Sequence, residues 1–167
     1  MKKFLVLFIC LFILLTPKVS AFESSATSAI LMDMDSNRVL LSKNKDKRML
    51  IASITKIMTA IIAIESNKSD DIVKVDDSIL KSYGSGIYIQ VGEEISLRDL
   101  VYGLMLRSGN DAALMIAKYI SGDIESFVEK MNIKAKEIGM TNTNFVNPSG
   151  LDAEGHLSSA YDVALMT

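Results

Sequence analysis

The sequence is poor in the residues on which disulfides and metal sites depend. Its 167 residues include one cysteine, one histidine and two prolines, and no tryptophan. Cys10 lies in an apolar N-terminal run that we expect to be removed, so the mature chain has no disulfide and no thiolate metal site. One histidine, without further ligands at set spacing, predicts no metal site of another kind. No Walker-type or dinucleotide-binding glycine motif is present, so we expect no cofactor.

Basic residues are too few for a nucleic-acid-binding protein. The chain has 18 lysine and arginine residues against 20 acidic ones, and Lys2, Lys3 and Lys18 lie in the segment that we expect to be removed. The mature chain is therefore acidic, whereas nucleic acid requires a basic face. The one basic cluster, residues 43–48, is interrupted by an aspartate and is only a weak indication of an anionic membrane surface.

The N-terminus has the organisation of a secretory signal peptide. Two lysines precede an apolar run of 12 residues from Phe4 to Leu15, and small residues precede a cleavage point after Ala21. A membrane span needs about 20 apolar residues, so an uncleaved anchor is the less favoured alternative. We predict that residues 1–21 are a signal peptide and that the protein is exported.

Residues 22–167 are patterned as one globular domain. Alternation and turn residues predict a hairpin over 28–41, a strand at 72–75 and a short extended run at 87–89. Apolar residues at helical spacing predict five helices, at residues 53–64, 96–106, 110–120, 123–138 and from 160 onward. The last helix, capped by Ser158 or Ser159, is still in pattern at Thr167, so we expect the sequence to be incomplete.

Serine and lysine three residues apart occur three times, as Ser42–Lys45, Ser53–Lys56 and Ser78–Lys81. A helix places such a pair on one face. If that helix is buried, desolvation lowers the lysine pKa, and the amine can then accept the serine proton. Only Ser53 begins a strongly apolar helix, because Ser42 lies in a charged loop and Ser78 in a polar turn. Ser53 is therefore the preferred nucleophile of the three.

Two alternatives stay open from the residues alone. Ser53 can be merely a helix cap, with Lys56 extending to solvent, and the residues do not separate this from catalysis. His156 can formally complete a Ser-His-Asp triad, but no Gly-x-Ser-x-Gly motif surrounds any serine. We expect His156 to be a structural loop residue.

Four blocks of residues, in order along the chain, resemble one family. They are residues 28–33, the run Leu50 to Ala60 with Ser53-Ile54-Thr55-Lys56, the motif Ser108-Gly109-Asn110, and residues 147–162. Together they are similar to the low-molecular-weight penicillin-binding proteins that act as D-alanyl-D-alanine carboxypeptidases. The resemblance covers about residues 25–167, and four ordered blocks are more specific than any single motif.

The resemblance implies an α+β fold of the β-lactamase/transpeptidase type, with an antiparallel sheet, a helical lobe and the active site between them. It implies that Ser53 attacks the bond between two D-alanines of a peptidoglycan stem peptide and that Lys56 accepts its proton. Ser108 would relay a proton to the leaving amine, and Asn110 would bind the substrate and help to hold Lys56. Without the resemblance, Ser108 and Asn110 are better explained as a turn and a helix cap. The loop at 81–87 is similar to a segment beside the family's site.

The resemblance also implies a place and partners for the protein. It implies action in the cell envelope, outside the cytoplasmic membrane, on peptidoglycan in cell-wall synthesis and cell shape, with β-lactams as inhibitors of Ser53. Family members often attach to the membrane through a C-terminal segment, which this sequence does not contain. No metal or other cofactor is implied.

The family's third motif is missing, because the sequence has no Lys-Thr-Gly, Lys-Ser-Gly or His-Thr-Gly. We therefore expect residues 22–167 to be the N-terminal part of a catalytic domain, without its C-terminal strands, and expect this chain alone to be inactive. One alternative is a non-catalytic, truncated or cell-wall-binding protein of the same fold. A class A β-lactamase is less favoured, because Gly109 stands where that class has aspartate.

Overall fold

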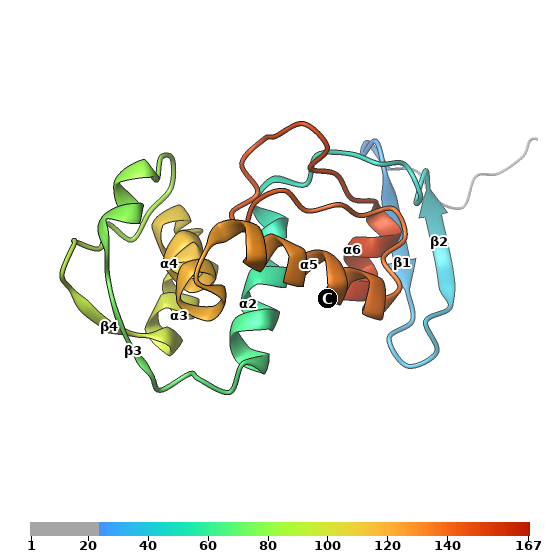
Figure 1. Cartoon of the computed structure of the whole chain (residues 1–167). Coiled ribbons are helices and arrows are strands. Elements are labelled where there is room, and N and C mark those ends of the chain that lie inside the picture. Colours follow the sequence, from blue (N-terminus) through green and yellow to red (C-terminus); the bar gives the residue numbers. More distant parts are fainter. Residues whose placement is uncertain (1–23) are drawn as a thin grey trace, which may run out of the picture.

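The computed structural model describes residues 24–167 (Figure 1). The predicted signal peptide, residues 1–21, lies outside the described residues. The elements follow in the order β1 (Ala29–Met32), β2 (Val39–Lys43), the 3-10 helix η1 (Ala52–Ile54), α2 (Thr55–Glu65), β3 (Ile72–Lys74), the 3-10 helix η2 (Asp77–Lys81), β4 (Glu94–Ser96), α3 (Leu97–Arg107), α4 (Asn110–Ser121), α5 (Ile124–Ile138) and α6 (Ala160–Met166).

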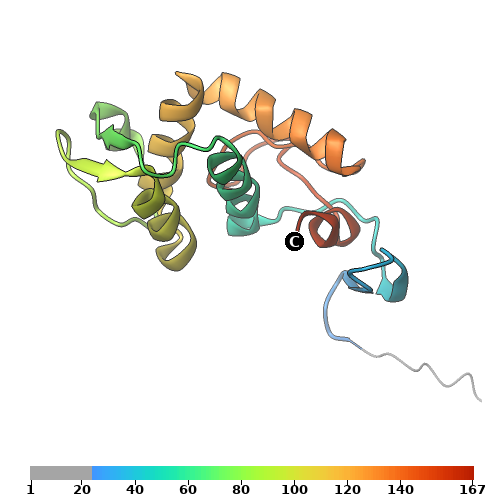
Figure 2. The ribbon, with the colours of Figure 1, turned by 90° about the horizontal axis from the view of Figure 1, so that it is seen from below.

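The elements form a helical lobe and a smaller end that carries the N-terminal hairpin. Helices α2, α3, α4 and α5 pack together, and the β3–β4 ribbon lies at the far side of α3 and α4 (Figure 1). Strands β1 and β2 lie at the opposite end beside α6, and the view from below shows α6 between the hairpin and α2 (Figure 2). The fold is α+β, as predicted, with two small antiparallel sheets in the described residues.

Side-chain caps determine where three of the helices begin. Ser96, Asp123 and Ser159 each accept a hydrogen bond from the backbone N–H three residues further on, at 3.0, 2.6 and 3.2 Å. A cap of this kind stabilises a helix by about 1 kcal/mol. The predicted cap at Ser96 is confirmed, and Ser159 rather than Ser158 caps α6. Gly139 ends α5 with a φ of +93°, a conformation that glycine adopts without strain.

Helix α4 is the centre of the apolar core. It contacts α2, α3 and α5, and its alanines 112, 113 and 117 are fully buried, so the neighbouring helices approach its backbone closely. Larger side chains, among them Met58 from α2 and Leu104 from α3, fill the remaining space. Each contributes about 1.5–3 kcal/mol on burial. Helix α2 is buried on most of its faces, as the apolar pattern of residues 54–64 predicted.

The predicted extended run at residues 87–89 is wrong. These residues are in no strand, and Tyr88 has a φ of +62°. Their backbone N–H groups bind a carboxylate, described below, instead of a neighbouring strand. The predicted strand at 72–75 does form, as β3, and it pairs with β4, from Ile72 opposite Ser96 to Lys74 opposite Glu94.

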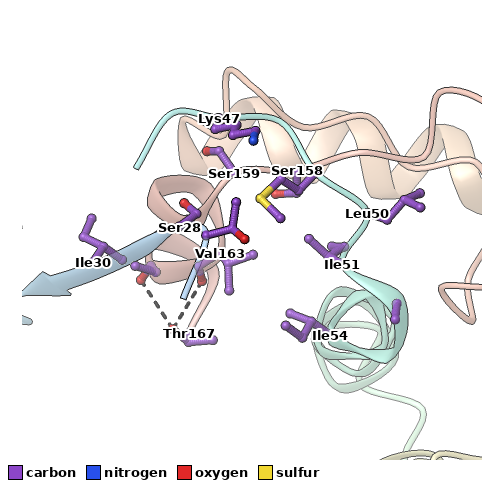
Figure 3. Close-up of a pocket in the computed structure, with 15 residues that line it drawn as sticks. Ser28, Ile30, Lys47, Leu50, Ile51, Ile54, Ser158, Ser159, Val163 and Thr167 are labelled. Atoms are coloured by element: carbon purple, nitrogen blue, oxygen red, sulfur yellow. Dashed lines mark hydrogen bonds between the residues drawn. The ribbon is translucent and has the colours of Figure 1, made fainter. Parts of the chain in front are cut away.

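A largely apolar groove of about 580 Å³ lies between β1, residues 47–54 and α6 (Figure 3). Ile30, Ile54 and Val163 line it from these three segments. The groove also reaches Ala52, the residue before Ser53. The hairpin end of the molecule therefore borders the turn that carries the predicted nucleophile.

Residues 24–167 contain neither a membrane-spanning helix nor a cluster of metal-binding side chains. No helix there has both the length and the apolar content to cross a membrane. No three histidine, cysteine or acidic side chains of that region gather in a way that suits a metal ion.

Candidate active site

Ser53 lies in the 3-10 helix η1, which leads directly into α2. The α-helix thus begins two residues later than predicted, at Thr55. Ala52 has a φ of +45°, and such backbone conformations cost of order 1–3 kcal/mol where a Cβ is present. Gly150 packs against this turn so closely that a Cβ on it would lie 1.8 Å from the Ala52 carbonyl oxygen. This backbone contact fixes the turn, and the Ser53 side chain is left exposed.

Lys56 lies one turn after Ser53 on the buried face of α2. Its side chain is 3% exposed, so the alternative in which it extends to solvent is wrong. The Lys56 Nζ atom is 3.3 Å from the Ser53 Oγ atom and donates to the Ser149 carbonyl oxygen at 2.6 Å. Burial lowers the pKa of Lys56, as the apolar surroundings predicted. An amine in this state is suited to accept the proton of the adjacent hydroxyl.

Ser108 approaches the same hydroxyl from the other side. It ends α3 in the left-handed conformation, with a φ of +56°, which is uncommon for a residue other than glycine. Its hydroxyl donates to the Ser53 Oγ atom at 3.0 Å. Ser53 is therefore contacted by an amine and by a second hydroxyl from elements that are far apart in the sequence.

Asn110 begins α4 and holds the loop at residues 82–88. Its backbone N–H donates to the Ser85 carbonyl at 2.8 Å, and its side-chain amide donates to the Tyr83 carbonyl at 2.7 Å. Among the hydrogen bonds of the described residues, none joins Asn110 to Lys56, so that predicted contact is not formed. The loop that was expected beside the site does lie against Asn110.

Asp111 holds the other end of the same loop, and sequence reasoning missed it. Its buried carboxylate accepts hydrogen bonds from the backbone N–H of Ile87, at 3.1 Å, and of Tyr88, at 2.7 Å. A Cβ at Gly86 would lie 3.0 Å from this carboxylate. In the sequence, the one sign of this role was the position of Asp111 next to Asn110. That sign is weak, because an acidic residue in the first turn of a helix is also explained by the helix dipole.

The loop at residues 147–151 supplies the carbonyl that binds Lys56. The Asn147 side-chain oxygen accepts from the Ser149 N–H at 3.2 Å, an Asx turn of the kind that an Asn-Pro-Ser-Gly sequence favours, and from the Gly150 N–H at 2.7 Å. The turn directs the Pro148 carbonyl to the Thr59 hydroxyl, at 2.7 Å, and the Ser149 carbonyl to the lysine. Thr59, Asn147 and Gly150 therefore support the site, although only the turn itself could be read from the sequence.

His156 is part of the support and does not contact the nucleophile. The Val146 N–H donates to Nδ1 at 3.1 Å, so Nδ1 carries no proton and the ring is neutral. Nε2 must then carry the proton and donate to the Thr55 hydroxyl, 2.8 Å away. Burial lowers the pKa of His156, while the charge of Asp152 acts in the opposite direction. These contacts give no support to a triad with Ser53.

The other two serine–lysine pairs do not form a comparable site. Lys45 binds the Asp46 carboxylate at 2.7 Å, and the Ser78 hydroxyl faces the Met115 sulfur at 3.7 Å. Lys81 is exposed. Only Ser53 has a buried lysine within reach.

A cavity of about 300 Å³ adjoins the site. The loop at 81–83, Asn110 and residues 147–153 line it, with apolar contributions from Leu114 and Ile124. The cavity reaches the site through Asn110 and Ser149, whereas Ser53, Lys56 and Ser108 do not line it.

The arrangement suits acyl transfer by an activated serine. The Ser53 hydroxyl proton can pass to a lysine whose burial favours the neutral form, and the oxygen can then attack a carbonyl carbon. The Ser108 hydroxyl is placed to carry a proton between Ser53 and a leaving group.

Comparisons with known proteins agree on one family. Residues 16–167 match the family model described as D-alanyl-D-alanine carboxypeptidase. The D-alanyl-D-alanine carboxypeptidase DacF of Bacillus subtilis is 43% identical over 154 residues, which cover 89% of this chain and 40% of that protein. DacC of Escherichia coli is 38% identical over 160 residues, again 89% of this chain and 40% of the relative.

The fold agrees with a solved structure of the same kind. The crystal structure of the D-alanyl-D-alanine carboxypeptidase DacD from Francisella tularensis has a TM-score of 0.83 and 38% identity, over 87% of this chain and 36% of that one. This confirms the predicted fold class. The chain spans about two fifths of the length of the curated relatives that it matches.

Proposed function

This chain belongs to the D-alanyl-D-alanine carboxypeptidase family, and we propose that it supplies Ser53 as the nucleophile of such an enzyme. The substrate would be a peptidoglycan stem peptide that ends in two D-alanines. Contacts of 3.3 Å to a buried lysine and 3.0 Å to a second hydroxyl are the observation that carries this proposal. A cell-wall-binding role without catalysis would leave this convergence on one serine unexplained.

The proposed reaction has two steps, acylation of Ser53 and hydrolysis of the resulting ester. In the first, the Ser53 Oγ atom attacks the carbonyl of the penultimate D-alanine, and its proton passes to Lys56. The C–N bond then breaks, a proton reaches the leaving amine through Ser108, and free D-alanine departs. In the second, water loses a proton to the same relay and attacks the ester, which releases the shortened peptide and restores the Ser53 hydroxyl.

The remaining parts of the site follow from the same proposal. Asn110 and the cavity beside it would contact the stem peptide. The backbone N–H of Ser53 would stabilise the oxyanion together with a second donor from outside residues 24–167. Donors of this kind each contribute about 10²–10³-fold in rate.

The setting of this activity is also a proposal. We propose that residues 1–21 direct export and are removed, that the enzyme acts in the cell envelope, and that residues 22–167 belong to its catalytic domain. β-Lactams would acylate Ser53 in place of substrate. Membrane association through a C-terminal segment would belong to the same proposal.

Release of D-alanine from a peptide ending in D-Ala-D-Ala tests the proposed function. The proteins to compare are this chain and a hybrid in which it replaces the matching part of the Bacillus subtilis relative. We expect release by the hybrid and its loss in the hybrid with Ser53→Ala. The matched control is Ser78→Ala, which removes the serine of another serine–lysine pair and should leave the rate unchanged. Release that survives Ser53→Ala would refute the assignment.

A further inference from the structure

His156 bridges the loop that binds Lys56 and the helix that carries Lys56. Its Nδ1 atom accepts from Val146, just before the turn at residues 147–151, and its Nε2–H group donates to Thr55, just before Lys56 on the chain. The ring is 1% exposed. One side chain therefore joins both halves of the contact between the Ser149 carbonyl and the lysine.

The bridge depends on the charge state of the ring. A second proton would have to occupy Nδ1, where the Val146 N–H group already points, so two donors would face each other. A buried imidazolium would also pay a desolvation cost. The bridge therefore holds only while His156 is neutral.

Other contacts decide which part of the loop depends on His156. Asn132 of α5 binds the residue before Val146 by two hydrogen bonds, accepting from the Phe145 N–H at 2.8 Å and donating to its carbonyl at 2.9 Å. Phe145 also packs edge-on against the His156 imidazole, with ring centroids 5.9 Å apart. The segment before residue 146 is thus held independently, whereas residues 146–150 are held by His156, by the Thr59 contact to Pro148 and by the packing of Gly150 against Ala52.

The charged groups around the ring are few. Asp152, in the same loop, acts on His156 and favours the charged form. Lys56 is the charged residue that follows Thr55 on α2, and it would disfavour an imidazolium. The contacts from the α5 side, Phe145 and Asn132, are uncharged.

We propose that His156 is a positioning residue for Lys56: neutral, it holds residues 146–150 so that the Ser149 carbonyl meets the lysine, and protonation of the ring releases that carbonyl. This deepens the proposed function, on which it rests, by giving the site a second pH-dependent group. Lys56 must lose a proton to act as base, and His156 must stay neutral to keep Lys56 in place.

The first test needs no activity. His156 is the one histidine of the chain, so its titration can be followed by NMR without ambiguity in the full chain. We expect the amide signals of Val146, Ser149 and Thr55 to shift with the imidazole as the pH falls. The protection of the Val146 amide hydrogen, relative to its intrinsic exchange at each pH, should fall at least tenfold. Amide signals that stay constant while the ring titrates would overturn the proposal.

The second test uses the rate at which benzylpenicillin acylates Ser53 in the hybrid with the Bacillus subtilis relative, measured against pH. Below the pKa of His156, the decimal logarithm of the wild-type rate should fall by about two for each unit by which the pH falls. The reason is that protonation of Lys56 and protonation of His156 then both oppose the reaction. In His156→Gln and His156→Asn the slope should be about one. A slope of two that persists in both variants would contradict the proposal.

The helix side provides a second pair of variants in case the histidine variants do not fold. Thr55→Val removes the acceptor of the Nε2–H group, whereas Thr55→Ser keeps it. We expect Val146 amide exchange to accelerate in Thr55→Val and to remain at the wild-type rate in Thr55→Ser. Equal exchange in the two variants would count against the bridge. If Ser53 of a folded hybrid is never acylated at any pH but the NMR result is as expected, the proposed function fails and the bridge stands.

Discussion

Gly150 is the position at which a single methyl group should disturb the nucleophile most. In Gly150→Ala the new Cβ would lie 1.8 Å from the Ala52 carbonyl oxygen, and real contacts of a Cβ are essentially never under 3.0 Å. The oxygen and the turn that follows it must therefore withdraw by about 1.2 Å. A misplacement of about 1 Å costs on the order of 10²-fold in rate, and we expect acylation of Ser53 to slow by that factor.

The same substitution should also reduce the stability of the fold. Left-handed backbone costs a residue with a Cβ about 1–2 kcal/mol, and overpacking costs about 1–3 kcal/mol more. The free energy of unfolding should therefore fall by about 2–5 kcal/mol. A loss of that size lowers Tm by roughly 6–15 °C in a chain of this length.

Gly155 provides the matched control. Its φ of +82° equals that of Gly150, but a Cβ there would meet only the Asn144 side chain, at an ordinary 3.7 Å. Gly155→Ala should show the backbone cost alone, about 1–2 kcal/mol, with little change in acylation. Thermal unfolding and a gel assay with fluorescent penicillin measure both quantities. Equal acylation rates in the two variants would refute the reasoning about Gly150.

Three further predictions concern charged groups. Lys56→Met should slow acylation by about 10²–10⁴-fold. It should also raise Tm at pH 7, because a buried lysine whose pKa is lowered reduces stability at every pH below the ordinary pKa of lysine. A lower Tm would contradict this prediction. Asp111→Asn places an amide against the Tyr88 N–H, so unfolding should become easier by about 1–3 kcal/mol and Tyr88 amide exchange should accelerate. Asp76 is bound by Lys118, which with further hydrogen bonds lowers its pKa to about 2. Asp76→Asn should therefore destabilise by at most about 1 kcal/mol at pH 7, a difference that disappears as the pH falls from about 4 to about 2.

The sequence was most informative where one local rule decided the structure. Ser96 and Gly139 were recognised as helix ends, because a cap or a left-handed residue is chosen by its own chemistry. For Lys56 the surrounding isoleucines left burial and exposure to solvent as open alternatives, and the structure decided for burial. Its pKa shift followed from that burial.

Contacts between distant segments were beyond the reach of such rules. Residues 87–89 have a β-like composition, yet the N–H groups of Ile87 and Tyr88 donate to Asp111 and not to a neighbouring strand. Gly150 against Ala52 and His156 against Thr55 join loops to a helix about 100 residues away. No pattern within a short window specifies a partner at that distance.

The resemblance nevertheless predicted which residues form the site, namely Ser53, Lys56, Ser108 and Asn110. Only the structure showed that Ser149, rather than Asn110, binds the lysine. The loop at residues 147–151 is therefore part of the structure that holds Lys56 in place.

Intact-protein mass after exposure to benzylpenicillin tests the central claim most directly. This chain and the hybrid with the Bacillus subtilis relative would be compared, each with its Ser53→Ala variant, and the adduct would be located by peptide mapping. We expect one penicilloyl group, on Ser53, in the hybrid at least, and no adduct in either Ser53→Ala protein. An adduct on another serine, or none in a folded hybrid, would show that Ser53 is not the nucleophile.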